Sequence, residues 1–276
     1  MKNARILPPK FLAAMIAVLP LPGSPLYDGD DQKVMNQALA DLEVYKNAGV
    51  DSILFENDHD LPYIQSPLDE KGIALMTEIV KAARGKFDGP IGIQMLEAAN
   101  ITSLEIAAEA DLDYIRVEAF VFAHVGGSGM INGSAGRILR RRKVLQSEHI
   151  KVFADVKKKH GSHSLTIDLD IKDEIMQAEF FLVDGVIVTS QFTGINPDKD
   201  DLTKAKSATK LPVLIGSGMT VENIQEYLPL ADGFIVGSYF RTDGKFLEKL
   251  EPERLHAFMR VFVSERKSIL DSANVA

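Results

Sequence analysis

The segment Leu211–Thr220, LPVLIGSGMT, predicts a buried strand that ends abruptly in a glycine-rich turn. Residues 213–215 form a continuous apolar run, as strands covered on both faces do. Gly216 and Gly218 tolerate backbone conformations that other residues avoid, and they let a ligand approach the main chain closely. Thr220 is a candidate N-cap, so a helix is expected to begin at once. The segment therefore predicts a strand–turn–helix unit of a parallel α/β fold.

The same pattern recurs about twenty residues later in Ala231–Phe240, ADGFIVGSYF, where an apolar strand again ends in glycine and serine. In (β/α)₈ barrels, the loops after the seventh and eighth strands commonly bind phosphate through main-chain N–H groups. We therefore predict one shared phosphate site. Its residues are Gly216, Ser217, Gly218, Gly237 and Ser238. The alternative is that these glycines only make tight turns.

The rest of the chain supplies the other strands and helices that a barrel needs. Apolar runs predict strands at Leu12–Val18, Ser52–Glu56, Ile91–Leu96, Tyr114–Glu118, Lys151–Val156, Gly185–Thr189, Val213–Ile215 and Phe234–Val236. Helical patterns lie at Asp31–Ala48, Leu68–Arg84, Ala99–Ala110, Ser134–Gln146, Ile167–Phe181, Asp198–Thr209, Val221–Leu228 and Pro252–Leu270. This alternation, without a composition break, predicts an α/β fold, a single (β/α)₈ TIM barrel over residues 1–276. An open doubly wound sheet is the rival, but no G-x-G-x-x-G follows the first strand.

Composition agrees with such a domain and limits its partners. The chain has 276 residues, of which 46% are hydrophobic, and a formal net charge of −8. An acidic balance argues against nucleic acid as a partner, because that partner requires a basic surface. Cysteine is absent, which excludes disulfides and thiolate chemistry and is compatible with an intracellular protein. We expect a cytoplasmic location, and a homo-oligomer is a further possibility.

The N-terminal apolar run, Phe11–Leu19, follows Lys2, Arg5 and Lys10 and so has some features of a signal peptide. Prolines rather than a small-residue cleavage site come after it, so we interpret it as the first strand. No segment is apolar for long enough to span a membrane, and no integral membrane segment is expected.

Charged residues on several strands are predicted to meet at the carboxyl ends of the barrel, where TIM barrels carry their active sites. Side chains alternate along a strand, which turns Ser52, Tyr114 and, with less support, Gln94 and Thr189 toward the axis. The candidate catalytic residues are Glu56, Arg116, Glu118, Asp155, Lys157 and His160. Lys157 or His160 would donate a proton and Asp155 or Glu56 would accept one. The alternative is a structural layer of ion pairs.

Two loops contain weaker signals. The loop Glu56–Tyr63, ENDHDLPY, has carboxylates that could gather a divalent metal such as Mg²⁺, although a solvated loop is the preferred interpretation. No metal ligands and no cofactor are predicted. The segment His124–Gly136, HVGGSGMINGSAG, is long and glycine-rich, which suggests a mobile lid or a disordered surface loop.

Several motifs together resemble the BtpA/SgcQ family over about Phe11 to Arg254. They are LPLPGSP, GVDSILFEN with DLPY, DYIRVEAF, FADVKKKH, VIVTSQFTG, PVLIGSGMTVENI and ADGFIVGSYFRTDG. The resemblance implies a TIM barrel related to the ribulose-phosphate-binding barrels. Its cyanobacterial namesake is associated with biogenesis of photosystem I, and the SgcQ branch with sugar transport and metabolism genes. The resemblance implies no particular reaction.

The chain departs from the family pattern at several polar positions. Ala17 stands where the family usually has His, and Arg241 where Lys is usual. The residues Glu97, Ala98 and Ala99 replace an RND motif, and Gly127 stands in place of an Asp. These departures imply either a different substrate or an anion site that has lost its chemistry.

Three functions remain open. The first is a cytoplasmic enzyme that binds a phosphorylated sugar or related metabolite and carries out isomerase, aldolase or lyase-type proton chemistry. The second is a non-catalytic biogenesis or assembly factor, which an exposed apolar patch would favour. The third is a metabolite-binding sensor that keeps the anion site without catalysis. Fold alone does not choose among them, and the enzyme is preferred.

Overall fold

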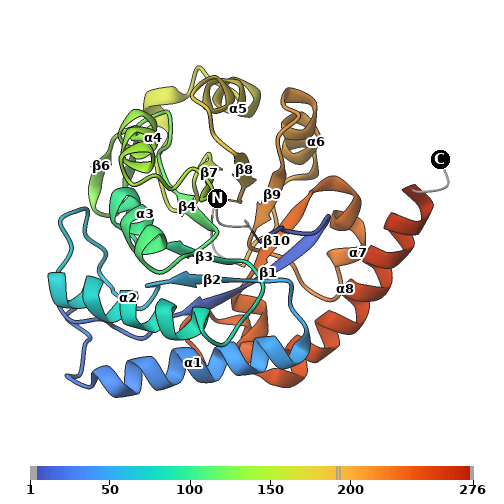
Figure 1. The fold of residues 1–276 in the computed structure, drawn as a ribbon. Helices are drawn as coiled ribbons and strands as arrows, with labels where there is room; N and C mark the ends of the chain where they lie inside the picture. Colours follow the sequence, from blue (N-terminus) through green and yellow to red (C-terminus); the bar gives the residue numbers. More distant parts are fainter. Residues whose placement is uncertain (1–4, 191, 193, 274–276) are drawn as a thin grey trace.

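The chain folds into a closed barrel of parallel strands, in the order β1-β10-β9-β8-β7-β4-β3-β2 (Figure 1). The computed structural model describes residues 5–190, 192 and 194–273. The barrel strands are β1 (Phe11–Ala17), β2 (Ser52–Glu56), β3 (Ile91–Gln94), β4 (Tyr114–Val117), β7 (Lys151–Val156), β8 (Gly185–Val188), β9 (Val213–Gly216) and β10 (Gly233–Val236). The predicted TIM barrel is confirmed.

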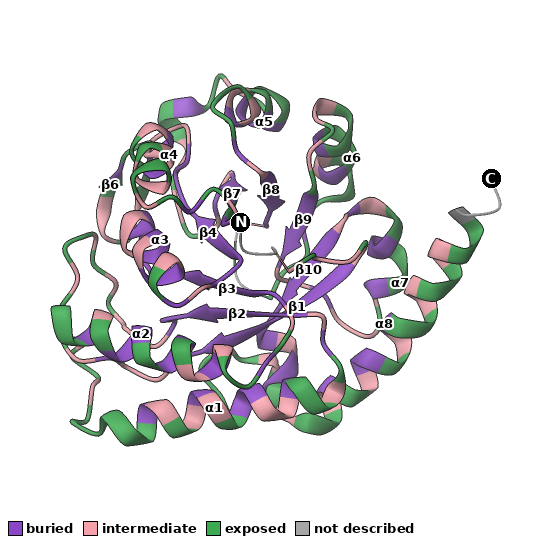
Figure 2. Cartoon of the chain, viewed as in Figure 1, coloured by how far each residue is buried: buried purple, intermediate pink, exposed green. Residues whose placement is uncertain are grey.

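Helices between successive strands form an outer ring around the barrel (Figure 1). They are α1 (Asp31–Ala48), α2 (Glu70–Arg84), α3 (Asn100–Glu109), α4 (Ala135–Val144), α5 (Ile171–Phe180), α6 (Lys199–Ala208), α7 (Ile224–Tyr227) and α8 (Pro252–Ala273). In Figure 2 the barrel strands are buried, apart from Lys151 at the start of β7, whereas the helices alternate buried and exposed positions. Within the described residues, none of the helices combines the length and apolarity that crossing a membrane requires.

Two predicted segments differ from the structure. The helix expected directly after Gly218 begins only at Ile224, because Thr220 donates its N–H to Asn223 Oδ1 in a turn and caps no helix (2.9 Å). The glycine-rich segment after β4 is not a disordered loop. It forms an antiparallel hairpin of β5 (His124–Gly126) and β6 (Gly129–Ile131).

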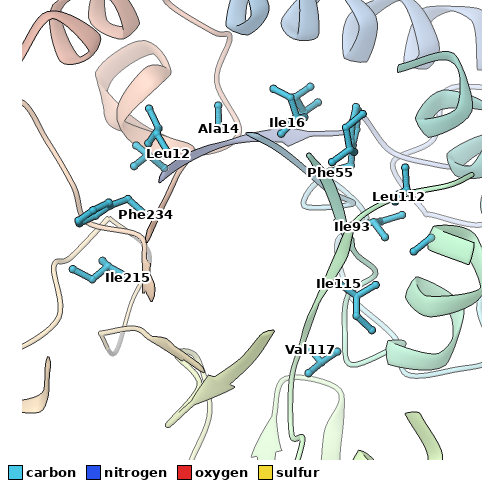
Figure 3. Packing of buried hydrophobic residues seen from close by; sticks show 14 of the residues in the cluster. Leu12, Ala14, Ile16, Phe55, Ile93, Leu112, Ile115, Val117, Ile215 and Phe234 are labelled. Atoms are coloured by element: carbon cyan, nitrogen blue, oxygen red, sulfur yellow. The ribbon is translucent and has the colours of Figure 1, made fainter. Parts of the chain in front are cut away.

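Side chains of the barrel strands alternate between two cores, as the period-two rule requires. On β1, Leu12, Ala14 and Ile16 lie in the outer core between the strands and the helices (Figure 3). Phe11 and Met15 belong to the smaller core inside the barrel. Each strand therefore contributes one face to packing against helices and the other to the barrel interior.

Aromatic side chains opposite glycines fill the lower part of the barrel interior. Phe11 is the register partner of Gly233, and Tyr114 is the partner of Gly92. A Cβ atom on Gly92 would lie 2.1 Å from the Tyr114 ring, so only glycine leaves room for it. This interior is packed, as in other TIM barrels, which leaves the carboxyl ends of the strands for a ligand.

Toward those carboxyl ends, the inward positions change from apolar to charged. On β2, Glu56 follows the inward-facing Leu54 by two residues. In the same way Arg116 follows Tyr114 on β4, and Asp155 follows Phe153 on β7. The strands thus place a layer of charge directly above the apolar interior.

Candidate functional site at the barrel mouth

A cavity of 310 Å³ lies above this charged layer. Its wall contains both charged and apolar side chains from loops on all sides of the barrel. The lining residues are Met15, Glu56, Asp58, Leu61, Tyr63, Gln94, Leu96, Glu97, Arg116, Glu118, Gly127, Asp155, Lys158, Lys159, His160, Ser217, Ile235, Gly237, Ser238 and Phe246. Charged groups from several strands and loops that line one cavity at the carboxyl ends are typical of a TIM-barrel active site.

Arg116 forms the centre of a buried ion triad. Its Nε and Nη2 each donate to one oxygen of Asp155 (both 2.9 Å), and its Nη1 donates to Glu56 Oε1 (3.0 Å). All three residues are buried. Gly216 packs beside the guanidinium, since a Cβ atom there would lie 3.3 Å from Arg116 Nη2. The triad satisfies its charges internally, so it provides a rigid floor for the cavity.

A second ion cluster joins the loops after β3, β4 and β7. Lys158 Nζ donates to Glu97 Oε1 (2.6 Å) and lies 3.3 Å from Glu118 Oε1. Glu118 also accepts from Gln94 Nε2 (3.1 Å) and from the N–H of Ala98 (3.0 Å). Burial raises the pKa of Glu118 to about 7, although Lys158 opposes the shift. Glu118 can therefore exchange a proton near neutral pH.

Two charged groups of the cavity wall have no partner for their side chains within the described residues. The carboxyl of Asp58 makes no hydrogen bond or ion pair there, and neither does the ammonium of Lys159. Burial and the neighbouring Glu56 carboxylate raise the pKa of Asp58 to about 7. Burial and, secondarily, Arg116 lower the pKa of Lys159. Both groups are thus available to a ligand.

The predicted inward position of Lys157 is wrong. The residue takes a left-handed backbone conformation (φ 48°) directly after β7 ends at Val156, which breaks the alternation of the strand. Its ammonium instead donates to the carbonyls of Leu169 (3.0 Å) and Thr166 (3.4 Å) and lies 3.7 Å from Glu174. Lys158 and Lys159 occupy the cavity wall in its place.

His160, also a predicted catalytic residue, lines the cavity. Its ring packs against Phe192, with the centroids 5.7 Å apart. Burial, followed by Lys159, lowers the pKa of His160. The side chain is therefore placed to contact a ligand as a neutral imidazole.

Three of the five predicted phosphate-binding residues, Ser217, Gly237 and Ser238, line the cavity. The other two lie outside its wall: Gly216 packs below, and Gly218 (φ 81°) lies against the backbone of residues 195–196. Within the described residues, the main-chain N–H groups of Gly237 and Ser238 donate no hydrogen bond. The wall formed after β10 thus offers two unbonded main-chain donors.

The residues at which the chain departs from the family pattern do not all lie in the cavity. Glu97 joins the Lys158 cluster, and Gly127 lines the cavity. Ala17 is the register partner of Glu56 at the end of β1. Arg241 is buried away from the cavity wall and pairs with Asp41 (3.3 Å).

Asp58, Lys158 and Lys159 were not among the residues predicted from the sequence. The run KKKH after the fifth predicted strand contained the signal for the lysines, but only the turn at Lys157 decides which of them face inward. The loop that follows β2 is also less solvated than expected, because Asn57 and Asp58 are buried. Among the described residues, no three His, Asp or Glu side chains converge as a metal site would require.

Comparisons with known proteins agree with the fold. The profile of the BtpA family matches residues 9–264. An uncharacterized mitochondrial protein of Caenorhabditis elegans is 37% identical over 251 residues, which cover 89% of this chain and 90% of the relative. Photosystem I biogenesis protein BtpA of Synechocystis is 32% identical over 92% of this chain and 88% of its own. Among solved structures, thiamine phosphate pyrophosphorylase from Pyrococcus furiosus superposes with a TM-score of 0.57 at 14% identity, covering 93% of this chain and 96% of the other.

Proposed function

The chain belongs to the BtpA family, and from the geometry of its cavity we propose that it is an enzyme acting on a phosphorylated sugar or a related metabolite. One observation carries this proposal. Gly237 and Ser238, whose main-chain N–H groups donate no hydrogen bond among the described residues, line the same cavity as Asp58 and Glu118, two residues whose pKa is raised to about 7. An anion site and proton-transfer groups in one cavity are what such a reaction requires.

The phosphate would lie against the loop after β10. Main-chain N–H groups bind phosphate well because they are fixed donors that carry no side-chain entropy. Lys159, which has no ion-pair partner among the described residues, lines the same cavity and would contact the ligand. One solved barrel that this chain resembles is named for thiamine phosphate, which agrees with a phosphorylated ligand.

The reaction would be of the isomerase, aldolase or lyase type. Asp58 and Glu118 would donate or accept protons, because a pKa of about 7 makes either direction accessible at neutral pH. His160 would be a third group able to carry a proton. Glu56, Arg116 and Asp155 would hold the floor of the site and orient the substrate rather than transfer protons.

Thermal unfolding with and without phosphorylated ligands tests this proposal. The purified protein is heated alone and with millimolar inorganic phosphate or sugar phosphates, each with Mg²⁺ and with a chelator. A ligand at about 100 times its Kd adds roughly 2.7 kcal/mol of stability, a rise of several degrees in a chain of this length. We expect phosphorylated sugars to raise the unfolding temperature and the unphosphorylated sugars to leave it unchanged.

Two variants of Ser238 locate the site. Ser238→Ala keeps the main-chain N–H and should keep the shift, whereas Ser238→Asp places a carboxylate where the phosphate would lie and should abolish it. Loss of the shift in both variants would assign binding to the hydroxyl instead of the main chain. No shift with any phosphorylated compound in the wild-type protein would contradict the proposal.

A non-catalytic assembly role is the second candidate, and one observation favours it. Met176 and Phe180 on α5 and Leu182 just beyond it are exposed apolar side chains, with Phe180 78% exposed. The name of the Synechocystis relative describes a biogenesis role for that protein. A negative ligand screen would make this role the better proposal. A cytoplasmic location and self-association stay predictions, and the Caenorhabditis elegans relative is named as mitochondrial.

A further inference from the structure

Three consecutive lysines follow β7, and the surroundings of their side chains differ. Lys157 points away from the cavity and donates to main-chain carbonyls near Glu174. Lys158 is buried and held between Glu97 and Glu118. Both ammonium groups are thereby occupied by partners, which makes them poor nucleophiles.

Lys159 differs from its neighbours in every respect that bears on nucleophilicity. Its main-chain N–H donates to Thr189 Oγ1 (3.3 Å), which fixes the start of the side chain. The half-buried residue lines the cavity, and its ammonium has no hydrogen bond or ion pair within the described part of the chain. Burial and the Arg116 guanidinium lower its pKa, which enlarges the fraction present as neutral amine. A desolvated lysine near another cation is a recognised form of activated amine.

Resting on the proposed function, we propose that Lys159 is a nucleophile that forms an imine with the carbonyl group of a phosphorylated aldehyde or ketone. The neutral Nζ attacks the carbonyl carbon, a C–N bond forms, and the carbonyl oxygen takes a proton to give a carbinolamine. Loss of water then converts the carbinolamine to the imine. No oxidant or reductant is needed, because the imine and one water molecule contain the same atoms and electrons as the amine and the carbonyl compound.

The cavity contains the other groups that this step requires. A proton must reach the departing hydroxyl group, and Asp58 and Glu118 line the same wall as Lys159. A phosphate bound to the N–H groups of Gly237 and Ser238 would keep the carbonyl end of the substrate inside the cavity. Binding energy from a remote phosphate is then used to position the reacting carbon.

Reductive trapping tests the inference without knowledge of the natural substrate. The full-length protein is incubated with pyridoxal 5′-phosphate, used only as a phosphorylated aldehyde, and then treated with borohydride, which adds hydride to the imine carbon and leaves a stable secondary amine. Peptide mass spectrometry with fragmentation separates Lys157, Lys158 and Lys159. We expect the label on Lys159 and little or none on Lys158, because Glu97 and Glu118 hold the Lys158 ammonium.

Matched reagents and variants define the outcome. Pyridoxal without the phosphate, or competition by inorganic phosphate, should reduce the label on Lys159 and leave any surface label unchanged. Lys159→Met should lose the cavity label, while Lys157→Met, a neighbouring change outside the cavity, should retain it. Circular dichroism confirms that both variants are folded.

The result that would contradict imine formation at Lys159 differs from the result that would contradict the phosphate site. If phosphorylated ligands raise the unfolding temperature but Lys159 is not labelled, or Lys158 is labelled in its place, the imine is wrong and the phosphate site stands. If phosphate neither stabilises the protein nor competes with the label, and Ser238→Asp changes nothing, the proposed function fails and the inference fails with it.

Discussion

At the scale of the residue, the barrel mouth contains two kinds of charged group. Arg116, Glu56 and Asp155 satisfy one another, so their burial is balanced inside the fold. Asp58 and Lys159 have no such partner among the described residues, and each is partly removed from water. Charged groups without partners reduce the stability of a folded protein, and they are kept mainly where a ligand uses them.

The raised pKa of Asp58 makes a pH-dependent prediction. Because its pKa in the folded protein, about 7, exceeds the unfolded value of about 4, folding favours the protonated form. The stabilising contribution is therefore complete below pH 4 and is lost as the pH rises through 7. Asp58→Asn should change stability little at pH 4.5 and raise the free energy of unfolding at pH 8 by up to about 4 kcal/mol, the energy that corresponds to a pKa difference of about 3.

Thermal unfolding of both proteins across this pH range measures the effect. Asp88→Asn, which changes an exposed carboxylate between α2 and β3, is the control and should leave the pH profile unchanged. A gain in stability that is equal at pH 4.5 and pH 8 would show that Asp58 acts through its size or hydrogen bonding and not through its charge.

At the scale of the element, the sequence predicted the strands closely but not the backbone that directly follows β7. Apolar runs identify β2 and β7 to the residue, because buried parallel strands must be apolar on both faces. The alternation of side chains predicts Arg116 and Asp155 correctly for the same reason. It fails one residue beyond β7, because the left-handed turn at Lys157 is a local backbone choice that periodicity does not contain.

The β5–β6 hairpin covers one side of the cavity, and the contacts that hold it there were not predicted from the sequence. The N–H of Ser128, between the two strands, donates to Glu97 Oε2 (3.0 Å), and the neighbouring Gly127 lines the cavity. Gln65 Nε2 donates to the carbonyls of Ser128 and Met130 (both 3.1 Å). These contacts link the hairpin to the loops after β2 and β3, so it is part of the cavity wall.

Adjacent glycines of this hairpin give a matched test of that role. An added Cβ atom at Gly126 would lie 2.7 Å from Glu97 Oε1 and 2.8 Å from Ile131 Cδ1, whereas nothing lies within 4 Å of one at Gly127. Glu97 cannot yield easily because Lys158 and Ser128 hold its carboxylate. We therefore expect Gly126→Ala to cost about 1–3 kcal/mol and Gly127→Ala to be close to neutral.

Urea unfolding of the two variants, followed by circular dichroism, gives the comparison. If Gly126→Ala is as stable as Gly127→Ala, the hairpin moves away from Glu97 without cost and does not form a fixed wall.

At the scale of the whole molecule, closure of the barrel brings the site together. Glu97 and Lys158 are 61 residues apart in the chain and meet only because the loops after β3 and β7 both reach the carboxyl end of the barrel. One sequence can show that such residues follow strands, but the pairing of Glu97 with Lys158 depends on the three-dimensional path of both loops. The fold and the inward positions of Arg116 and Asp155 were thus predictable, while the division of the charges into paired and unpaired groups was not.

Closure also makes a prediction about unfolding, because β1 pairs with both β2 and β10 and leaves the barrel without an edge. If the chain is one domain, damage to either half should destabilise the same structure. Ile79 on α2 and Phe258 on α8 are fully buried in the outer core. Ile79→Ala and Phe258→Ala should each lower the free energy of unfolding by about 2–5 kcal/mol.

Urea unfolding, followed by far-UV circular dichroism for helices and near-UV circular dichroism for tyrosine packing, distinguishes one domain from two. Both variants should move the midpoint of the same transition, because the ring of strand pairs leaves no boundary at which the halves could separate. Two transitions, with Ile79→Ala moving only one and Phe258→Ala only the other, would mean that the halves of the barrel are stable independently. The paired strands β1 and β10 would then be a contact between domains, and the cavity above them would lie at that boundary.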